Sequence, residues 1–345
     1  MRLHAVFVAL LMVAGCGGTS TPQPSGGGAG GTGGGGAAGG GGGGAGGAGG
    51  AGGAGGIGGS WLTGSSATLL SSTDGITFLE HAAPTGGDLY ALTCVGHLDG
   101  WAAGAGGAII ATHDGGTTWY AQSSGVTTSL RALAFADRDH GLAVGDGGVV
   151  LRTADGGASW QRVSVATSAD LRGVAMSSFD GRAFVVGAGG VMLRSTDGGQ
   201  SFAAPTTIAS AELRAVRFAG EVGVGFAVGD GGLVLTTHDG ASWSALSAAA
   251  PGNLSALSIS DDASRIVAVG AAGLVWRSAD SGASWQAQPS GVAASLATVG
   301  FSDEAPGLGW AAGAGGTLLV THDDGLSFTP LVSPTQADLY AVEDL

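Results

Sequence analysis

The chain has 345 residues with 26 acidic side chains, 12 arginines and no lysine, which gives a formal net charge of −14. A surface this acidic repels nucleic acid and anionic lipid, so neither is an expected partner. The two cysteines, Cys16 and Cys94, are too few for a disulfide framework.

Residues 1–15 have the features of a bacterial signal peptide. A positive charge at Arg2 precedes an apolar run over residues 5–13, which is too short to span a bilayer. The run ends in Val-Ala-Gly-Cys, which resembles a lipobox and implies a lipid anchor on Cys16. A plain cleaved signal peptide with an incidental cysteine is the alternative. Gly17 stands where an inner-membrane retention signal usually has Asp, so we expect an outer-membrane lipoprotein that faces either the periplasm or the outside.

Residues 16–60 are expected to form a disordered tether behind this anchor. Residues 26–56 are Gly and Ala with a single Thr32, so they offer no large apolar side chain to offset the entropy lost on ordering. A flexible coil of this length spans roughly 35–40 Å, which holds a folded domain away from the lipid surface. That domain, residues 61–345, carries all 26 acids and 11 of the arginines, a net charge of −15.

A short motif recurs through residues 61–345 at intervals of 40 to 43 residues, in forms such as TADGGASW at 153–160. The first aspartates of its seven copies are Asp74, Asp114, Asp155, Asp197, Asp239, Asp280 and Asp323. A fixed period of this size indicates stacked units of one kind. Each unit contains four short apolar or alternating runs separated by Gly-rich turns, which predicts a four-stranded antiparallel meander.

Seven units predict an all-β, seven-bladed β-propeller. Residues 61–75 align with the second and third strands of a unit, whereas the last nine residues, ADLYAVEDL, align with a first strand. We therefore expect the two ends to share one blade and close the ring, which removes exposed sheet edges. The recurrent V-G-x-G-G segment lies between two strands with no helix after it, so it predicts a hairpin turn and not a dinucleotide-binding loop.

The motif itself fits a structural turn. Its Asp can accept hydrogen bonds from backbone N–H groups, its Gly tolerates positive φ, and its Trp or Phe can bury a large apolar surface. The motif resembles the Asp-box, or BNR repeat, which in β-propellers occupies a peripheral turn away from the ligand-binding centre. The copies at 72–78 and 237–243 are one residue shorter than the others, so their turns are expected to differ.

The repeat as a whole resembles the photosystem II stability and assembly factor family of propellers. Residues 130–160 and 171–202 match its pattern L-x-x-V-x-F…G-x-A-V-G-x-G-G-x-x-L-x-T-x-D-G-G-x-x-W. The resemblance implies a non-enzymatic module that binds proteins during the assembly of membrane complexes. We expect it to be monomeric, to need no cofactor and to bind a protein or polysaccharide at the cell envelope. The alternative is an Asp-box glycoside hydrolase such as a sialidase. Sialidases have six blades and an Arg-Ile-Pro signature, whereas here Arg265-Ile266 is followed by Val267.

Other candidate site residues have simpler explanations. Each of His113, His238 and His322 fills the variable position of an Asp-box, which favours a solvated turn histidine over a metal ligand. Three further arginines precede Asp-boxes and are expected to line an exposed strand face: Arg152, Arg194 and Arg277. No nucleophile–base arrangement is recognisable, so no catalytic residue and no metal are expected.

A candidate binding centre follows from the innermost strands, which line the central channel of a propeller. The residue after each inner-strand Leu is, in ring order, Tyr340, Tyr90, Arg131, Arg172, Arg214, Ser255 and Ala297. The first five form a polar arc, and we expect its three arginines to bind an anionic group of a partner. The alternative is internal pairing with the acids that precede the same leucines: Asp88, Asp170, Glu212 and Asp338. Strand alternation places those acids on the opposite face unless bulges intervene.

Overall fold

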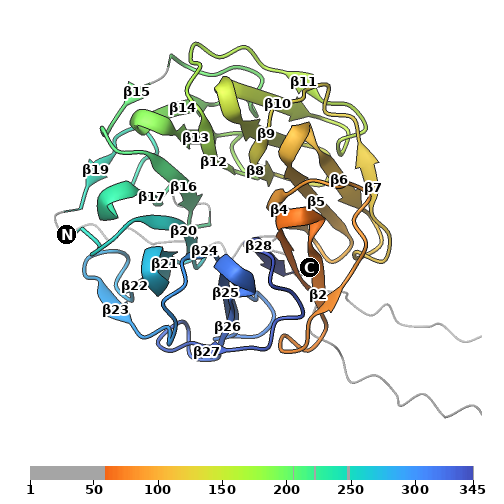
Figure 1. Ribbon diagram of the computed structural model, residues 1–345. Helices are drawn as coiled ribbons and strands as arrows, with labels where there is room; N and C mark the ends of the chain where they lie inside the picture. Colours follow the sequence, from red (N-terminus) through yellow and green to blue (C-terminus); the bar gives the residue numbers. More distant parts are fainter. Residues whose placement is uncertain (1–58, 205, 221–222, 247–248, 345) are drawn as a thin grey trace, which may run out of the picture.

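The computed structural model describes residues 59–204, 206–220, 223–246 and 249–344. The predicted signal peptide, the lipidation site Cys16 and residues 17–58 of the predicted tether lie outside these ranges. In the described part of the chain, seven four-stranded antiparallel sheets form a ring of blades around a central opening (Figure 1). The predicted seven-bladed, all-β propeller is confirmed.

Each blade places one strand at the ring centre and three more towards the outside. The inner strands are β4 (Leu89–Val95), β8 (Leu130–Phe135), β12 (Leu171–Met176), β16 (Leu213–Phe218), β20 (Leu254–Ile259), β24 (Leu296–Phe301) and β28 (Leu339–Asp344). The second strands are β5 (Asp99–Gly104), β9 (Gly141–Gly145), β13 (Ala183–Gly187), β17 (Gly225–Gly229), β21 (Ile266–Gly270), β25 (Gly309–Gly313) and β1 (Ser60–Gly64). The third strands are β6 (Ile109–Thr112), β10 (Val149–Thr153), β14 (Val191–Ser195), β18 (Val234–Thr237), β22 (Val275–Ser278), β26 (Leu318–Thr321) and β2 (Leu69–Ser72). The short outer strands are β7 (Tyr120–Gln122), β11 (Gln161–Arg162), β15 (Thr206–Thr207), β19 (Ser244–Ala245), β23 (Gln286–Gln288), β27 (Thr329–Pro330) and β3 (Leu79–Glu80).

The two ends of the described chain close the ring within one blade. The strand order of this sheet is β28-β1-β2-β3, so the last strand pairs with the first. Strand β28 runs antiparallel to β1, with Leu62 opposite Val342, and Ser60 Oγ donates a hydrogen bond of 3.0 Å to Asp344 Oδ1. The predicted closure is therefore present, and it leaves no inner strand unpaired in this blade.

The hydrophobic core lies between neighbouring blades. Apart from Asp99 at the start of β5, the second strands are buried along their whole length, as in the run GLAVG of β9, because both faces of the sheet are covered by other blades. Leu142 and Val144 of β9 pack against Leu171 and Val174 of the next inner strand. The continuous apolar runs of the second strands thus follow from their two covered faces.

The V-G-x-G-G segments form the turns between second and third strands. In the turn after β9, Gly147 has φ 67°, a left-handed conformation that glycine adopts without strain. A Cβ atom on Gly145 would lie 2.0 Å from the carbonyl oxygen of Ser129, so only glycine allows the inner strand to approach. These constraints explain the repeated glycines, and the predicted hairpin turn is confirmed.

The seven copies of the Asp-containing motif, called boxes below, are turns closed by their own carboxylates. In the box at 153–160, Asp155 Oδ1 accepts hydrogen bonds from Ser159 N and Thr153 Oγ1, each at 2.8 Å, and Asp155 Oδ2 accepts from Ser159 Oγ at 2.6 Å. These hydrogen bonds, that of the Ser159 hydroxyl foremost, lower the pKa of Asp155. In the shorter copy at 237–243, Asp239 accepts hydrogen bonds from Ser242 N and Ala241 N instead, and these lower the pKa of Asp239 to about 2. The missing residue is thus absorbed by a tighter turn.

The same boxes hold neighbouring blades together. Trp101 Nε1 of β5 donates to Gly156 O of the next blade at 2.9 Å, and Arg152 Nε of β10 donates to Gly198 O at 2.9 Å. Arg277 Nε likewise donates to Asp324 O at 2.8 Å. The prediction that Arg152, Arg194 and Arg277 line an exposed strand face was wrong, because all three are half-buried, and Arg152 and Arg277 contact the next blade.

Candidate functional site

The seven residues that follow the inner-strand leucines line one cavity of about 340 Å³ on the ring axis. They are Tyr340, Tyr90, Arg131, Arg172, Arg214, Ser255 and Ala297, and each lies near the start of its inner strand. The five polar side chains occupy neighbouring strands, and we call them the polar arc. The opposite wall at this end holds only the small side chains of Ser255 and Ala297.

A β-bulge presents each of these residues to the cavity. The pairing register of β8 with β9 shifts between Leu130 and Ala132, so Arg131 is the extra residue, and the same shift occurs in every other blade. A bulge breaks the alternation of side chains along a strand. The alternation argument, which placed the acids before the leucines on the opposite face, was wrong, because each acid lies two residues before the residue of the arc and side chains two apart share one face of a strand.

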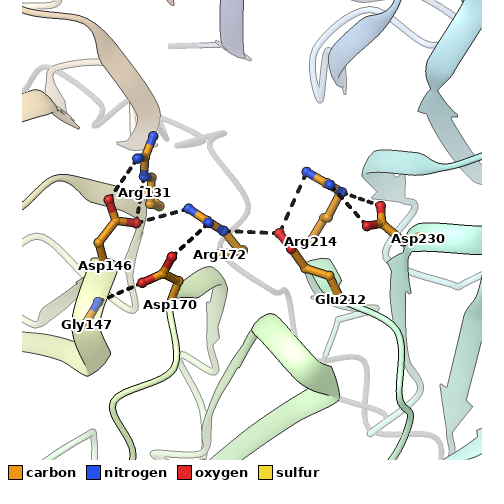
Figure 2. A network of polar contacts seen from close by, with 8 residues as sticks. All are labelled: Arg131, Asp146, Gly147, Asp170, Arg172, Glu212, Arg214 and Asp230. Atoms are coloured by element: carbon orange, nitrogen blue, oxygen red, sulfur yellow. Dashed lines mark hydrogen bonds and ion pairs between the residues drawn. The ribbon is translucent and has the colours of Figure 1, made fainter.

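Acids near the polar arc are bound to its arginines (Figure 2). Arg172 lies at the centre of the network, where Nη2 donates to Asp170 Oδ2 at 3.1 Å, Nε to Glu212 Oε1 at 3.2 Å and Nη1 to Asp146 Oδ1 at 3.0 Å. Arg131 also binds Asp146 with two hydrogen bonds, of 3.0 and 2.8 Å. The alternative of internal pairing thus describes Asp170 and Glu212 correctly.

At the far end of the network, Arg214 makes a second bidentate contact with a carboxylate. Arg214 Nε and Nη2 donate to the two carboxylate oxygens of Asp230 at 2.7 and 3.2 Å. Nη1 of Arg214 lies 3.8 Å from Glu212 Oε1, so the chain of charges runs from Arg131 to Asp230 across three blades. Planar guanidinium and carboxylate groups joined in this way hold each other in fixed positions.

Sequence reasoning assigned Asp146 and Asp230 only to turns. Both occupy the variable position of V-G-x-G-G, in the two blades whose inner strands carry Arg131 and Arg214. The corresponding position is Ala in the turn after β13, whose blade carries Arg172. The coincidence of Asp in the turn with Arg in the inner strand of the same blade was the signal that could have revealed these pairs.

The tyrosines extend the arc beyond the arginines. The guanidinium carbon of Arg131 lies 4.4 Å from the centre of the Tyr90 ring, and the rings of Tyr90 and Tyr340 are 5.4 Å apart. Tyr90 also donates from its hydroxyl to Asp88 Oδ2 at 3.2 Å. Partial burial and the neighbouring Asp88 raise the pKa of Tyr90, so this hydroxyl keeps its proton well above neutral pH.

The arginines are paired without being buried. Their side chains remain 29%, 25% and 39% exposed for Arg131, Arg172 and Arg214, respectively. A guanidinium has five N–H donors, and Arg131 directs two of them to Asp146. The arc therefore presents hydrogen-bond donors to the cavity, although its charge is already balanced by carboxylates.

The three histidines of the boxes do not assemble into a site. His113 Nδ1 lies 2.5 Å from Asp99 Oδ1, whereas no ion pair links His238 or His322 to an acid among the described residues. Within the ranges that the structure describes, no three His, Cys, Asp or Glu side chains are grouped so that they could hold a metal ion. The described part also contains no helix long and apolar enough to cross a membrane.

Comparison with known proteins identifies the family. The family model described as photosynthesis system II assembly factor YCF48 matches residues 122–207 and 183–304, which together make up more than half of the chain. The chain belongs to the YCF48 family. No curated protein matches it.

Solved structures of the YCF48 family share its fold. YCF48 bound to D1 peptide superposes with a TM-score of 0.58 at 19% identity, over 81% of this chain and 86% of that one. YCF48 from Cyanidioschyzon merolae superposes with a TM-score of 0.61 at 22% identity, over 75% of this chain and 90% of that one. The GH74 xyloglucanase from Xanthomonas campestris gives 0.61 at 15% identity, over 73% of this chain but only 46% of the xyloglucanase.

At the other end of the channel, this YCF48-family propeller carries a carboxyl group, that of Glu343, whose ionised form is disfavoured by burial. Glu343 of β28 lines the cavity, and burial raises its pKa from 4.5 to about 7, although Arg217 opposes the shift. The folded protein then keeps a proton that the unfolded chain releases above pH 4.5. Stability therefore decreases as the pH rises from about 4.5 to 7.

Replacing Glu343 with Gln should remove this dependence. Because the side chain keeps part of its surface exposed, we expect the variant to be more stable than the parent by about 1–3 kcal/mol at pH 8 and equally stable near pH 4. Urea denaturation at both pH values measures the difference. A variant that loses stability at pH 8 would show that Glu343 makes favourable contacts as a carboxylate.

Proposed function

We propose that this protein is a non-enzymatic binding module that takes a segment of a partner protein at the end of the channel lined by the polar arc. Three arginines and two tyrosines form one continuous donor-bearing surface there, and the ion pairs hold the arginines in place before any ligand arrives. Membership of the YCF48 family supports protein binding, since one solved YCF48 is in complex with a D1 peptide.

The charges of the arc indicate which groups of a partner it would recognise. The three arginines face four acids: Asp146, Asp170, Glu212 and Asp230. The site is therefore net negative and would repel a free anion. Uncommitted N–H donors and two tyrosine rings suit main-chain carbonyl oxygens and side-chain packing instead. The observation that carries the proposal is therefore the rigid, charge-balanced arc with its donors still exposed.

The test blocks the cavity without disturbing the ion pairs. Ser255 lies across the cavity from the arc, so Ser255→Trp should fill the opening and reduce partner capture from a solubilised envelope extract by about tenfold or more. Thr206→Trp on the exposed outer strand β15 is the matched control and should capture as the parent does. Equal capture by both variants would place the binding surface elsewhere.

Ser255→Trp is preferable to removal of the arginines. Replacing Arg131, Arg172 and Arg214 with Gln would leave four neighbouring carboxylates without their partners, so lost capture could reflect lost stability. The same preparations should be assayed on xyloglucan and sialosides, because a xyloglucanase shares the fold. Turnover of either substrate would favour a glycoside hydrolase.

We also propose that the propeller is tethered to the outer membrane through Cys16. The lipobox-like sequence before this residue and the Gly/Ala-rich stretch after it support the proposal. Cys16→Ser should leave the precursor uncut or release the domain into the soluble fraction, as followed by fractionation and immunoblotting. Mature protein that remains in the membrane fraction would contradict the anchor.

A further inference from the structure

A second cavity of about 270 Å³ lies at the opposite end of the inner strands from the polar arc. Its described walls come from the ends of β8, β12 and β16, with Phe135, Met176 and Phe218, and from residues 177–179, which follow β12. It adjoins the channel, because Arg217 and Glu343 line both cavities. No function proposed above makes use of this site.

Aromatic rings give the second cavity fixed apolar walls. Phe135 stacks on Trp101 with 3.8 Å between ring centres, and Phe218 stacks on Phe184 at 4.5 Å. Phe179 also lines the cavity and is 65% exposed, which is unusual for so large an apolar side chain. An apolar group that enters the cavity would therefore bury surface that is now in contact with water.

Two opposite charges face this cavity without contacting each other. Arg217 Nη1 donates to the carbonyl oxygen of Val216 at 3.1 Å, and among the described residues no carboxylate oxygen lies within 4.0 Å of its guanidinium. Glu343 likewise has no cation within 4.0 Å in the described part of the chain. Arg217 differs in this respect from the three acid-paired arginines of the arc.

In the described part of the chain, the other charges near Glu343 and along this cavity belong to Asp303, Asp344, Arg182 and Asp261. Asp303, which follows β24, and the adjacent Asp344 both disfavour its ionisation, while Arg217 of β16 favours it. Arg182 lines the cavity but is ion-paired with Asp180, and Asp261 is exposed at the edge. A carboxylate held near two other acids lowers the stability of the folded protein. Groups of this kind are typical of ligand-binding sites.

We propose that the second cavity binds a free amino acid with an apolar side chain. Its carboxylate would pair with Arg217, its ammonium group with Glu343, and its side chain would pack against Phe135 and Phe179. A zwitterion satisfies both charges at once, which neither a simple anion nor a simple cation does. The volume suits a single residue, since pockets for larger ligands begin near 300 Å³.

Binding should depend on pH through Glu343. The ammonium group requires the ionised carboxylate, and in the empty protein burial keeps the pKa of Glu343 near 7. Binding therefore releases a proton below that pH, and the affinity should fall as the pH decreases from 8 to 6. Proton release is a readout that packing of an apolar group alone would not give.

Isothermal titration of the full chain with L-phenylalanine tests the proposal, with 3-phenylpropanoate and phenethylamine as ligands that each lack one charge. We expect each comparison ligand to bind at least about tenfold more weakly than L-phenylalanine. Arg217→Gln and Glu343→Gln should weaken L-phenylalanine binding by a similar factor, and Phe179→Ala should weaken it further than Arg162→Gln, a control on the exposed strand β11.

Two results would overturn the proposal. One is the absence of L-phenylalanine binding at millimolar concentration by the folded parent. The other is 3-phenylpropanoate binding as tightly as L-phenylalanine with no effect of Glu343→Gln, which would mean a site for apolar anions. Melting curves of all variants establish that they are folded. The Ser255→Trp capture experiment is independent, so the two proposals fail or stand separately.

Discussion

Deletion of residues 336–345 is expected to lower the melting temperature by about 10–20 °C. The deletion removes β28, whose Leu339 and Val342 are 0% and 4% exposed and belong to the core shared with the preceding blade. It also removes the strand that pairs with the inner edge of β1, so the ring opens at an unprotected edge. Differential scanning calorimetry measures the change, and light scattering should show increased association.

The deletion has a direct control. A synthetic peptide with the sequence of residues 336–345, added during refolding, should restore much of the lost stability because it can pair with β1. Val332→Ala provides a second control, since Val332 is 92% exposed and should not matter. A truncated protein that melts like the parent would contradict ring closure by β28.

Replacement of Trp101 with Ala is expected to cost about 3–5 kcal/mol of unfolding free energy. Trp101 is completely buried, stacks on Phe135 and donates to Gly156 O of the next blade at 2.9 Å. The substitution thus removes both a large part of one inter-blade core and a hydrogen bond between blades. Equilibrium urea unfolding measures the loss.

Substitution by Phe separates these two contributions. Gly156 O also accepts from Gln122 Nε2 at 3.0 Å, so Trp101→Phe leaves this oxygen with a donor and should cost about 1 kcal/mol. Trp310 makes the equivalent contact with Gly75 O at 2.7 Å across the closing blade. Equal losses for Trp101→Ala and Trp101→Phe would show that the indole N–H, and not packing, dominates.

The fold could be predicted because its determinants are local and repeated. Each box closes its turn with hydrogen bonds among residues at most four apart, as Asp155 does with Thr153 and Ser159. The seven copies then define blade number, and the apolar runs define the strands. Closure of the ring followed from the mismatch between the first and last units.

The candidate site could be predicted only in part, because its chemistry depends on contacts between blades. The inner-strand register located Arg131, Arg172 and Arg214 on one cavity, but the contacts of Arg172 with Asp146 and Glu212 join different blades and leave no local signal. Arg217 and Glu343 lie far apart in the sequence and come to line one cavity only when the ring closes.

Site-specific photo-crosslinking tests the central proposal most directly. A benzoylphenylalanine placed at Ser255, on the cavity wall opposite the arc, should crosslink to a partner protein in intact cells. The same group at Ser244, on the exposed outer strand β19, should not. Crosslinks from position 255 alone are the result that we expect. Crosslinks from 244 alone, or from neither position while the protein still captures its partner, would contradict binding at the polar arc.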